Sequence, residues 1–141
     1  AVLGIGTDAN GHYQTGLRHA MKLWNVADAD IEKFIANEAM ATLSGTSEEN
    51  LEKIATQRWI AYFTASFEAW AVVRDTGYPK LPGVDSNNLD QDMYEIGDLN
   101  GHYPQRMRYG SGAYNKNGDN VRAAVSVQGA DVQATKLFWA K

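Results

Sequence analysis

One long stretch without Gly or Pro, from residue 47 to residue 75, constrains this chain more than any other part of the sequence. Thr46 precedes it and forms the pattern of a capping box with Glu49, while Gly77 and Pro79 follow it. These are the start and stop signals of a helix. Apolar side chains occupy most of its circumference, which is typical of a helix buried between others. The sequence therefore predicts one continuous, central helix here.

The aromatic and small residues of this stretch indicate that it packs closely against partners. Trp59 and Trp70 are eleven residues apart, about three helical turns, so we expect both on one buried face. Ala61, Ala65 and Ala69 leave room for a second helix to approach closely. The question is whether a chain of 141 residues supplies enough partner helices.

Three further helices are predicted from apolar residues that recur at three- and four-residue spacing. They span about residues 13–24, 29–42 and 120–128, and Asp28 is the expected N-cap of the second. Residues 76–116 are predicted to be mostly irregular because Pro, Gly, Asn and Asp are frequent there. The expected fold class is mainly α, with antiparallel helical packing, a long irregular loop and an extended C-terminal tail.

Composition excludes several classes of function. The net charge is −4 and the pI is near 5.3, so no basic surface for nucleic acid is expected. The chain has no cysteine, which removes disulfides, thiol catalysis and cysteine-ligated zinc. No apolar run reaches the length of a membrane-spanning helix. The N-terminus does not resemble a signal peptide, so we expect either a cytosolic protein or a piece whose targeting segment has been removed.

Metal and cofactor sites receive little support from the sequence. His12 and His19 have no third ligand at suitable spacing, and no HExxH pattern occurs. Asp28 and Asp30 are weak calcium candidates, since helix capping also explains acidic residues at that position. No phosphate loop or other cofactor motif is present, and no cofactor is expected.

Charged residues on and after the long helix allow two interpretations. Glu68 and an acid from residues 85–98 could form a glycosidase pair, although Glu68 falls on the polar strip of its helix. Arg74, Arg106 and Arg108 are better explained as structural residues. Arg74 lies in the last turn of the predicted helix, where its guanidinium could tie the following loop back by hydrogen bonds.

A series of motifs runs through the chain in a fixed order. The series comprises Tyr13 to Trp24, Gln57-Arg58-Trp59-Ile60-Ala61, Glu68-Ala69-Trp70, Arg74-x-Thr76-Gly77-Tyr78-Pro79, Pro104-x-Arg106-x-x-Tyr109, Gln128-Gly129-x-Asp131 and Lys136-x-x-Trp139. In order and spacing it resembles the C-terminal part of the SusD/RagB family, the outer-membrane nutrient-binding lipoproteins of Bacteroidetes. One motif alone would be weakly specific, but the whole series is specific and spans essentially the entire chain.

The resemblance implies a fold and a function. The helices would pack in the tetratricopeptide-like manner of that family, and residues 1–141 would be the C-terminal segment of a longer protein whose signal peptide and lipid anchor lie upstream. The parent would bind an oligosaccharide or other nutrient without catalysis and deliver it to a SusC-like TonB-dependent transporter. The resemblance assigns no ligand-binding residue. The matched residues that look structural are Gln57, Trp59, Glu68, Trp70, Arg74, Thr76, Gly77, Tyr78, Pro79, Arg106 and Tyr109.

Two other functions remain open from the residues alone. A helical-repeat module that binds a protein partner would account for the apolar helix faces equally well. An acid-pair glycosidase is less favoured, because a carboxylate on the polar strip of its helix, such as Glu68, is expected to be solvated or ion-paired. We expect no enzyme activity and no nucleic-acid partner.

Overall fold

The computed structural model describes residues 7–81, 99 and 103–140. The chain divides into two compact units, residues 1–73 and 74–141, and each is described by itself. Within the described residues the regular structure consists of five α-helices and one short 3₁₀ helix, with no strand. The expectation of a mainly α fold is therefore confirmed. None of the described helices is long and apolar enough to cross a membrane.

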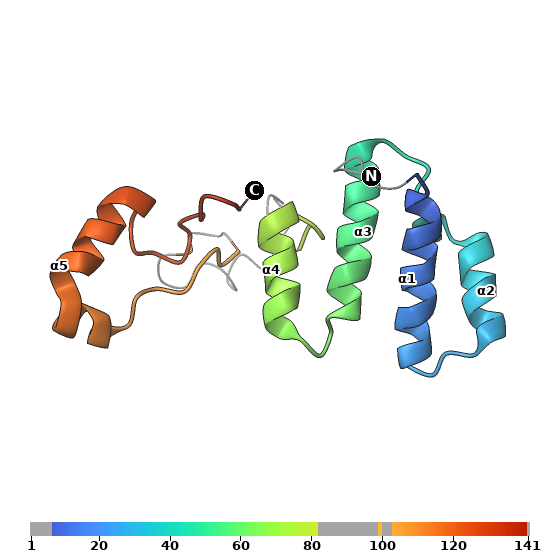
Figure 1. Ribbon diagram of the computed structural model, residues 1–141, viewed down its shortest axis with the longest axis horizontal. Coiled ribbons are helices and arrows are strands. Elements are labelled where there is room, and N and C mark those ends of the chain that lie inside the picture. The colour runs from blue at the N-terminus through green and yellow to red at the C-terminus, as the bar shows by residue number, and fades with distance from the viewer. Residues whose placement is uncertain (1–6, 82–98, 100–102, 141) are drawn as a thin grey trace. The chain divides into compact units, whose positions relative to one another are not determined.

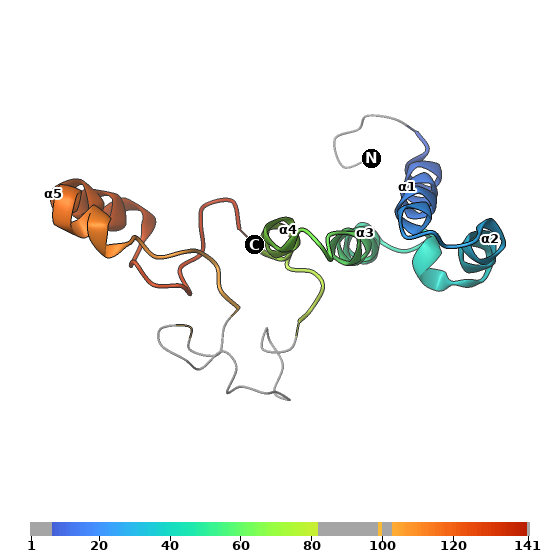
Figure 2. The ribbon, with the colours of Figure 1, turned by 90° about the horizontal axis from the view of Figure 1, so that it is seen from below.

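Helix α1, Ala9–Leu23, is the centre of the first unit. It begins where the Asp8 carboxylate accepts a hydrogen bond from the backbone N–H of Gly11, at 2.7 Å, which satisfies one of the unpaired donors of a helix start. Leu17 is its buried residue. Figures 1 and 2 show α1 between α2, Asp28–Asn37, and α3, Ser47–Ala61.

Hydrogen bonds from α1 and from α3 hold the connection between α2 and α3 in place. Helix α2 is followed by the 3₁₀ helix Ala39–Ala41. The Tyr13 hydroxyl of α1 donates to the carbonyl of Met40 at 2.6 Å. From α3, the Lys53 ammonium donates to the carbonyls of Ala39 and Thr42, both at 2.8 Å. These bonds tie the 3₁₀ helix and the residue after it to α1 and α3.

Two predictions for α2 are wrong. The helix ends at Asn37 and not near residue 42, because Glu38 adopts an extended backbone (φ −95°, ψ 127°) before the 3₁₀ helix. Asp28 is the first residue of the helix and not its N-cap. That position belongs to Ala27, which makes no side-chain capping bond. The acidic side chains of Asp28 and Asp30 instead lie in the first turn, where the helix dipole favours negative charge.

The prediction of one continuous helix from 47 to 75 is also wrong. Helix α3 ends at Ala61, and α4 runs from Ser66 to Thr76. Between the two helices the backbone forms turns. The N–H of Phe63 donates to the carbonyl of Ile60, and the N–H of Ala65 donates to the carbonyl of Tyr62. Such bonds to the third residue back close a turn and end the α-helical ladder. No Gly or Pro marks the break, and aromatic residues there are only moderate helix formers.

The start of α3 matches the sequence signal. The Thr46 hydroxyl accepts a hydrogen bond from the Glu49 N–H at 3.3 Å, and the Glu49 carboxylate accepts one from the Thr46 N–H at 2.7 Å. This reciprocal pair is the predicted capping box. Hydrogen bonds from the Thr46 backbone N–H and from the Thr46 hydroxyl also lower the pKa of the Glu49 carboxyl.

The second unit contains helix α5, Ser111–Gln128, and irregular chain before and after it. The prediction that the irregular region extends to residue 116 and that a helix begins near 120 is wrong. Helix α5 starts nine residues earlier, with a kink at Asn117 (φ −148°, ψ 38°). Gly and Asn are poor helix formers, and their frequency between Ser111 and Asn120 conceals this helix in the sequence. Buried Val121 anchors it.

Candidate functional site

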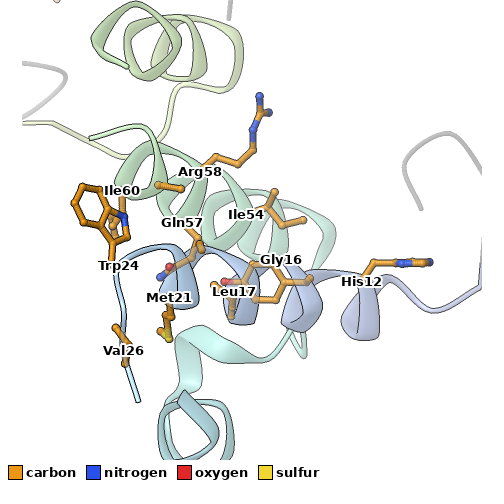
Figure 3. Close-up of a pocket in the computed structure, with 13 residues that line it drawn as sticks. His12, Gly16, Leu17, Met21, Trp24, Val26, Ile54, Gln57, Arg58 and Ile60 are labelled. Carbon is orange, nitrogen blue, oxygen red and sulfur yellow. The ribbon is translucent and has the colours of Figure 1, made fainter. Parts of the chain in front are cut away.

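A groove runs between α1 and α3 in the first unit, with a volume of about 330 Å³ (Figure 3). Helix α1 and the loop after it supply one side, and α3 supplies the other. The lining residues are His12, Tyr13, Gly16, Leu17, Ala20, Met21, Trp24, Val26, Ile54, Gln57, Arg58, Ile60 and Ala61. The groove is the candidate site because it is a concave surface formed by two packed helices.

Few polar groups are available to a ligand in this groove. The Tyr13 hydroxyl is occupied, since it donates to the Met40 carbonyl at 2.6 Å, and burial raises the pKa of Tyr13 to about 12. In Figure 3 the Arg58 side chain extends away from α1. His12 lies at one end of the groove in the same view. Gln57 is the remaining polar side chain of the lining. The chemistry of the groove therefore suits apolar side chains.

An exposed apolar surface continues from the groove. We define it as Trp24, Val26, Ile60 and Phe63. The first three line the groove, and the rings of Trp24 and Phe63 meet edge to face with centroids 6.4 Å apart and planes at 71°. Trp24 is 53% exposed, Ile60 51% and Phe63 81%. Large side chains exposed together in this way typically mark an interaction surface.

The two tryptophans of the predicted central helix do not share one helix. Trp59 lies on α3 and Trp70 on α4, because the break at residues 62–65 separates them. Both are half-buried, and the ring of Trp70 packs against exposed Phe67 with centroids 6.4 Å apart. The expectation that both tryptophans lie on one buried helix face is therefore wrong.

Arg74 holds parts of the second unit together. It lies in the last turn of α4, as predicted. Its Nη1 donates to the carbonyl of Gln105 at 2.7 Å, and its guanidinium carbon lies 4.7 Å from the centre of the Trp139 ring. One side chain thus contacts two segments far apart in sequence, through a hydrogen bond and a cation–π contact.

The Thr-Gly-Tyr-Pro motif forms the turn after α4. The backbone N–H of Tyr78 donates to the Thr76 hydroxyl at 3.1 Å, and that hydroxyl donates to the Tyr78 carbonyl at 3.2 Å. Gly77 adopts φ 76°, a conformation that L side chains rarely take. The Tyr78–Pro79 peptide bond is cis. The motif residues thus fix the path of the chain.

Arg106 belongs to a polar network in the second unit. Its Nη2 donates to the Asp131 carboxylate at 2.9 Å, and only 6% and 10% of the two side chains are exposed. The same carboxylate accepts hydrogen bonds from the Tyr109 N–H at 3.1 Å and from the Tyr114 hydroxyl at 2.8 Å. The Tyr109 hydroxyl in turn accepts from the Gln128 side chain at 3.0 Å. Asp131 therefore joins three segments.

The environment of Asp131 favours its ionised form. Burial opposes ionisation, but hydrogen bonds from Tyr109 and Tyr114 and the charges of Arg106 and Arg108 outweigh it. Together they hold the pKa of the Asp131 carboxyl below its ordinary value. Asp131 belongs to the Gln128-Gly129-x-Asp131 motif, but nothing in the sequence marks it as the partner of Arg106. A separation of 25 residues leaves no local spacing signal.

The calcium candidates do not form a cluster. Asp28 pairs with the Lys22 ammonium at 3.2 Å, with 79% of its side chain exposed, and Asp30 is exposed in the same turn. Among the described residues, no group of three or more His, Cys, Asp or Glu side chains could hold a metal ion. Glu68 is exposed in the first turn of α4, and residues 85–98, which would supply its partner acid, lie outside the described residues.

Comparison with known proteins identifies a family. The pattern of the SusD-like family, described as Susd and RagB outer membrane lipoprotein, matches residues 40–140. A solved structure named "Bacteroidetes AC2a SusD-like" is 30% identical, with a TM-score of 0.80 over 99% of this chain. A chitin-binding SusD homolog from Flavobacterium johnsoniae is 26% identical, with a TM-score of 0.68 over 96% of this chain. No curated protein matches. The chain spans 27% and 32% of the length of these two solved structures.

Proposed function

The chain belongs to the SusD-like family of outer-membrane lipoproteins, and from this membership we propose that it forms part of a protein that binds oligosaccharide at the outer membrane without chemical change. The observation that carries the proposal is the family match over residues 40–140. The chitin-binding homolog from Flavobacterium johnsoniae supports carbohydrate as the class of nutrient. Such binding relies on stacking against aromatic rings and on hydrogen bonds to sugar hydroxyls.

Delivery to a transporter is the second part of the proposal. By analogy with the family, the bound oligosaccharide passes to a SusC-like TonB-dependent transporter in the same membrane. The family description as an outer membrane lipoprotein supports this location.

We further propose that residues 1–141 act as the C-terminal segment of a longer SusD-like protein. The relatives of known structure are between three and four times as long as this chain, which spans 27% and 32% of their length. The groove between α1 and α3, with exposed Trp24, Ile60 and Phe63 beside it, then packs against apolar side chains of the remaining protein. Covering such a surface removes apolar area from water and stabilises the assembly.

The groove itself is a poor sugar site. Every sugar hydroxyl that leaves water needs a hydrogen-bond partner. The Tyr13 hydroxyl is already bonded, and the polar side chains left in the lining are Gln57, His12 at one end and Arg58, which extends away from α1 (Figure 3). The site residues carried by the family motif have structural contacts: Arg74 bonds the Gln105 carbonyl and Arg106 pairs with Asp131. In this proposal the sugar is bound elsewhere in the parent protein.

A module that binds a separate protein is the second candidate. The exposure of Phe63 (81%) and Phe67 (74%) favours it, because exposed aromatic residues are frequent at protein interfaces.

The two candidates differ in their ligand, which is a saccharide in the first and a protein in the second. Calorimetric titration of the parent protein with an oligosaccharide panel, followed by chromatography for cleavage products, tests the proposal. Saccharide binding without products supports it, whereas product release that Glu68→Gln abolishes would establish the glycosidase.

A further inference from the structure

Helix α5 contains an Asn-Gly pair at the point where its backbone leaves the helical conformation. Asn117 has φ −148° and ψ 38° and divides α5 into two helical parts (Figure 1). Asn117 is exposed, and Gly118 follows it directly. The Asn120 side-chain amide donates to the Asn117 Oδ1 at 2.6 Å. This bond joins two exposed side chains of the same helix, so it does not tie Asn117 to a distant segment.

We propose that Asn117–Gly118 is a site of spontaneous deamidation in the folded chain, favoured over Asn10–Gly11, a modification independent of the proposed function. The backbone nitrogen of Gly118 attacks Cγ of Asn117, the Cγ–Nδ2 bond breaks, and ammonia leaves with the proton from the Gly118 N–H. Water then opens the resulting succinimide at either carbonyl. The products are aspartate and isoaspartate at position 117, and each carries a new negative charge.

A second Asn-Gly pair, Asn10–Gly11, provides a comparison within the same chain. It lies in the first turns of α1, whose residues form one regular helix. The attacking atom is occupied here, because the Gly11 N–H donates to the Asp8 carboxylate at 2.7 Å. The Asn10 Oδ1 accepts a hydrogen bond from the N–H of Leu43 at 2.8 Å, which ties the side chain to a distant segment. Reaction at Asn10 requires both bonds to break.

The charged groups beside the two glycines differ, with a carboxylate at Gly11 and an ion pair of Arg122 with Asp119 at Gly118. A carboxylate next to the Gly11 N–H opposes loss of the proton that precedes attack. At Gly118 the neighbour is a cation: a Cβ built on this glycine would lie 3.0 Å from Nη1 of Arg122. The same guanidinium pairs with Asp119 through Nη2 at 2.6 Å. The guanidinium stabilises the deprotonated nitrogen, and the Asp119 carboxylate offsets this only in part, so the balance favours reaction at Asn117 over Asn10, where a carboxylate stands without a cation among the described residues.

Incubation of the full chain at mildly alkaline pH and peptide mapping by mass spectrometry test the proposal. We expect the Asn117 peptide to acquire aspartate and isoaspartate several-fold faster than the Asn10 peptide in the folded chain, and at a similar rate in urea. Arg122→Gln should slow the reaction at Asn117 and leave that at Asn10 unchanged, while Asp8→Asn should accelerate it at Asn10. Asn117→Gln should remove the products at 117.

Two results would overturn the proposal. Equal rates at Asn10 and Asn117 in the folded chain would show that the kink and the local charges have no effect. A rate difference that persists unchanged in urea would assign it to neighbouring sequence and not to the fold. The third Asn-Gly pair, at residues 100–101, lies outside the described residues, so its rate enters neither comparison.

Discussion

The guanidinium of Arg106 and the carboxylate of Asp131 form an ion pair at 2.9 Å with 6% and 10% of their side chains exposed. The pair joins the segment before α5 to the segment after it. Breaking a buried pair by removing one charge leaves the other uncompensated, which is costly. Tyr109 and Tyr114 add hydrogen bonds to the same carboxylate. Asp131 therefore links the chain before α5, α5 itself and the chain after it.

The first prediction concerns Asp131 directly. Asp131→Asn should destabilise the second unit, because Arg106 then keeps a buried charge without a counter-ion. Hydrogen exchange of the α5 amides measures the change. Asp119→Asn is the matched control, because it also removes one carboxylate from an ion pair. In that pair 99% of the Asp119 side chain and 66% of the Arg122 side chain are exposed, and an exposed pair stabilises the fold by about 1 kcal/mol or less. Equal exchange rates in the two variants would contradict the prediction.

The second prediction is a pH dependence. The pKa of Asp131 in the folded chain lies below its ordinary value of 3.8. A carboxyl with a lowered pKa contributes stability above its ordinary pKa, and this contribution disappears as the pH falls through the folded pKa. We expect the α5 amides to lose protection below about pH 4 and Asp131→Asn to weaken this dependence. An acid transition of α5 that is identical in both proteins would argue against it.

The third prediction tests the capping box of α3. Thr46→Ala removes the hydroxyl that accepts from the Glu49 N–H and should reduce the free energy of unfolding by about 1 kcal/mol. Denaturant unfolding of the first unit, followed by tryptophan fluorescence, measures it. Ser47→Ala provides the control, because Ser47 is the exposed first residue of the helix. A loss in the control as large as in Thr46→Ala would show that the cap is not responsible.

The fourth prediction concerns the exposed apolar surface of Trp24, Val26, Ile60 and Phe63. The isolated chain should enhance the fluorescence of the dye ANS or self-associate, because its exposed side chains lack the cover that we propose for the parent protein. Phe63→Gln should reduce the dye signal. Val127→Gln, at a residue 89% exposed on α5, should leave it largely unchanged. A monomer that binds no dye would contradict the proposed covering of the groove.

Local signals in the sequence identified local structure correctly. The capping box of Thr46 and Glu49 is present, because both partners lie within one turn. Arg74 ties the following chain back through the Gln105 carbonyl, as the position of a cation in a last helical turn suggested. The mainly α class followed from apolar periodicity, which reports burial on one face of a helix.

The features that the sequence did not reveal depend on contacts or on weak propensities. The break between Ala61 and Ser66 carries no Gly or Pro, so the stop signals that end most helices are missing. Helix α5 contains Gly112 and Gly118, which local propensity disfavours, yet buried Val121 secures it. The groove between α1 and α3 forms only when the two helices pack together, so no local sequence motif predicts it.

Binding of oligosaccharide without catalysis is the central property of the proposed function. Calorimetric titration of the parent protein with oligosaccharides of several classes, chitin fragments included, tests it most directly. We predict saturable binding of at least one class, unchanged saccharide recovered afterwards, and no comparable binding by residues 1–141 alone. Absence of binding to any saccharide, or recovery of cleaved products, would contradict the proposed function.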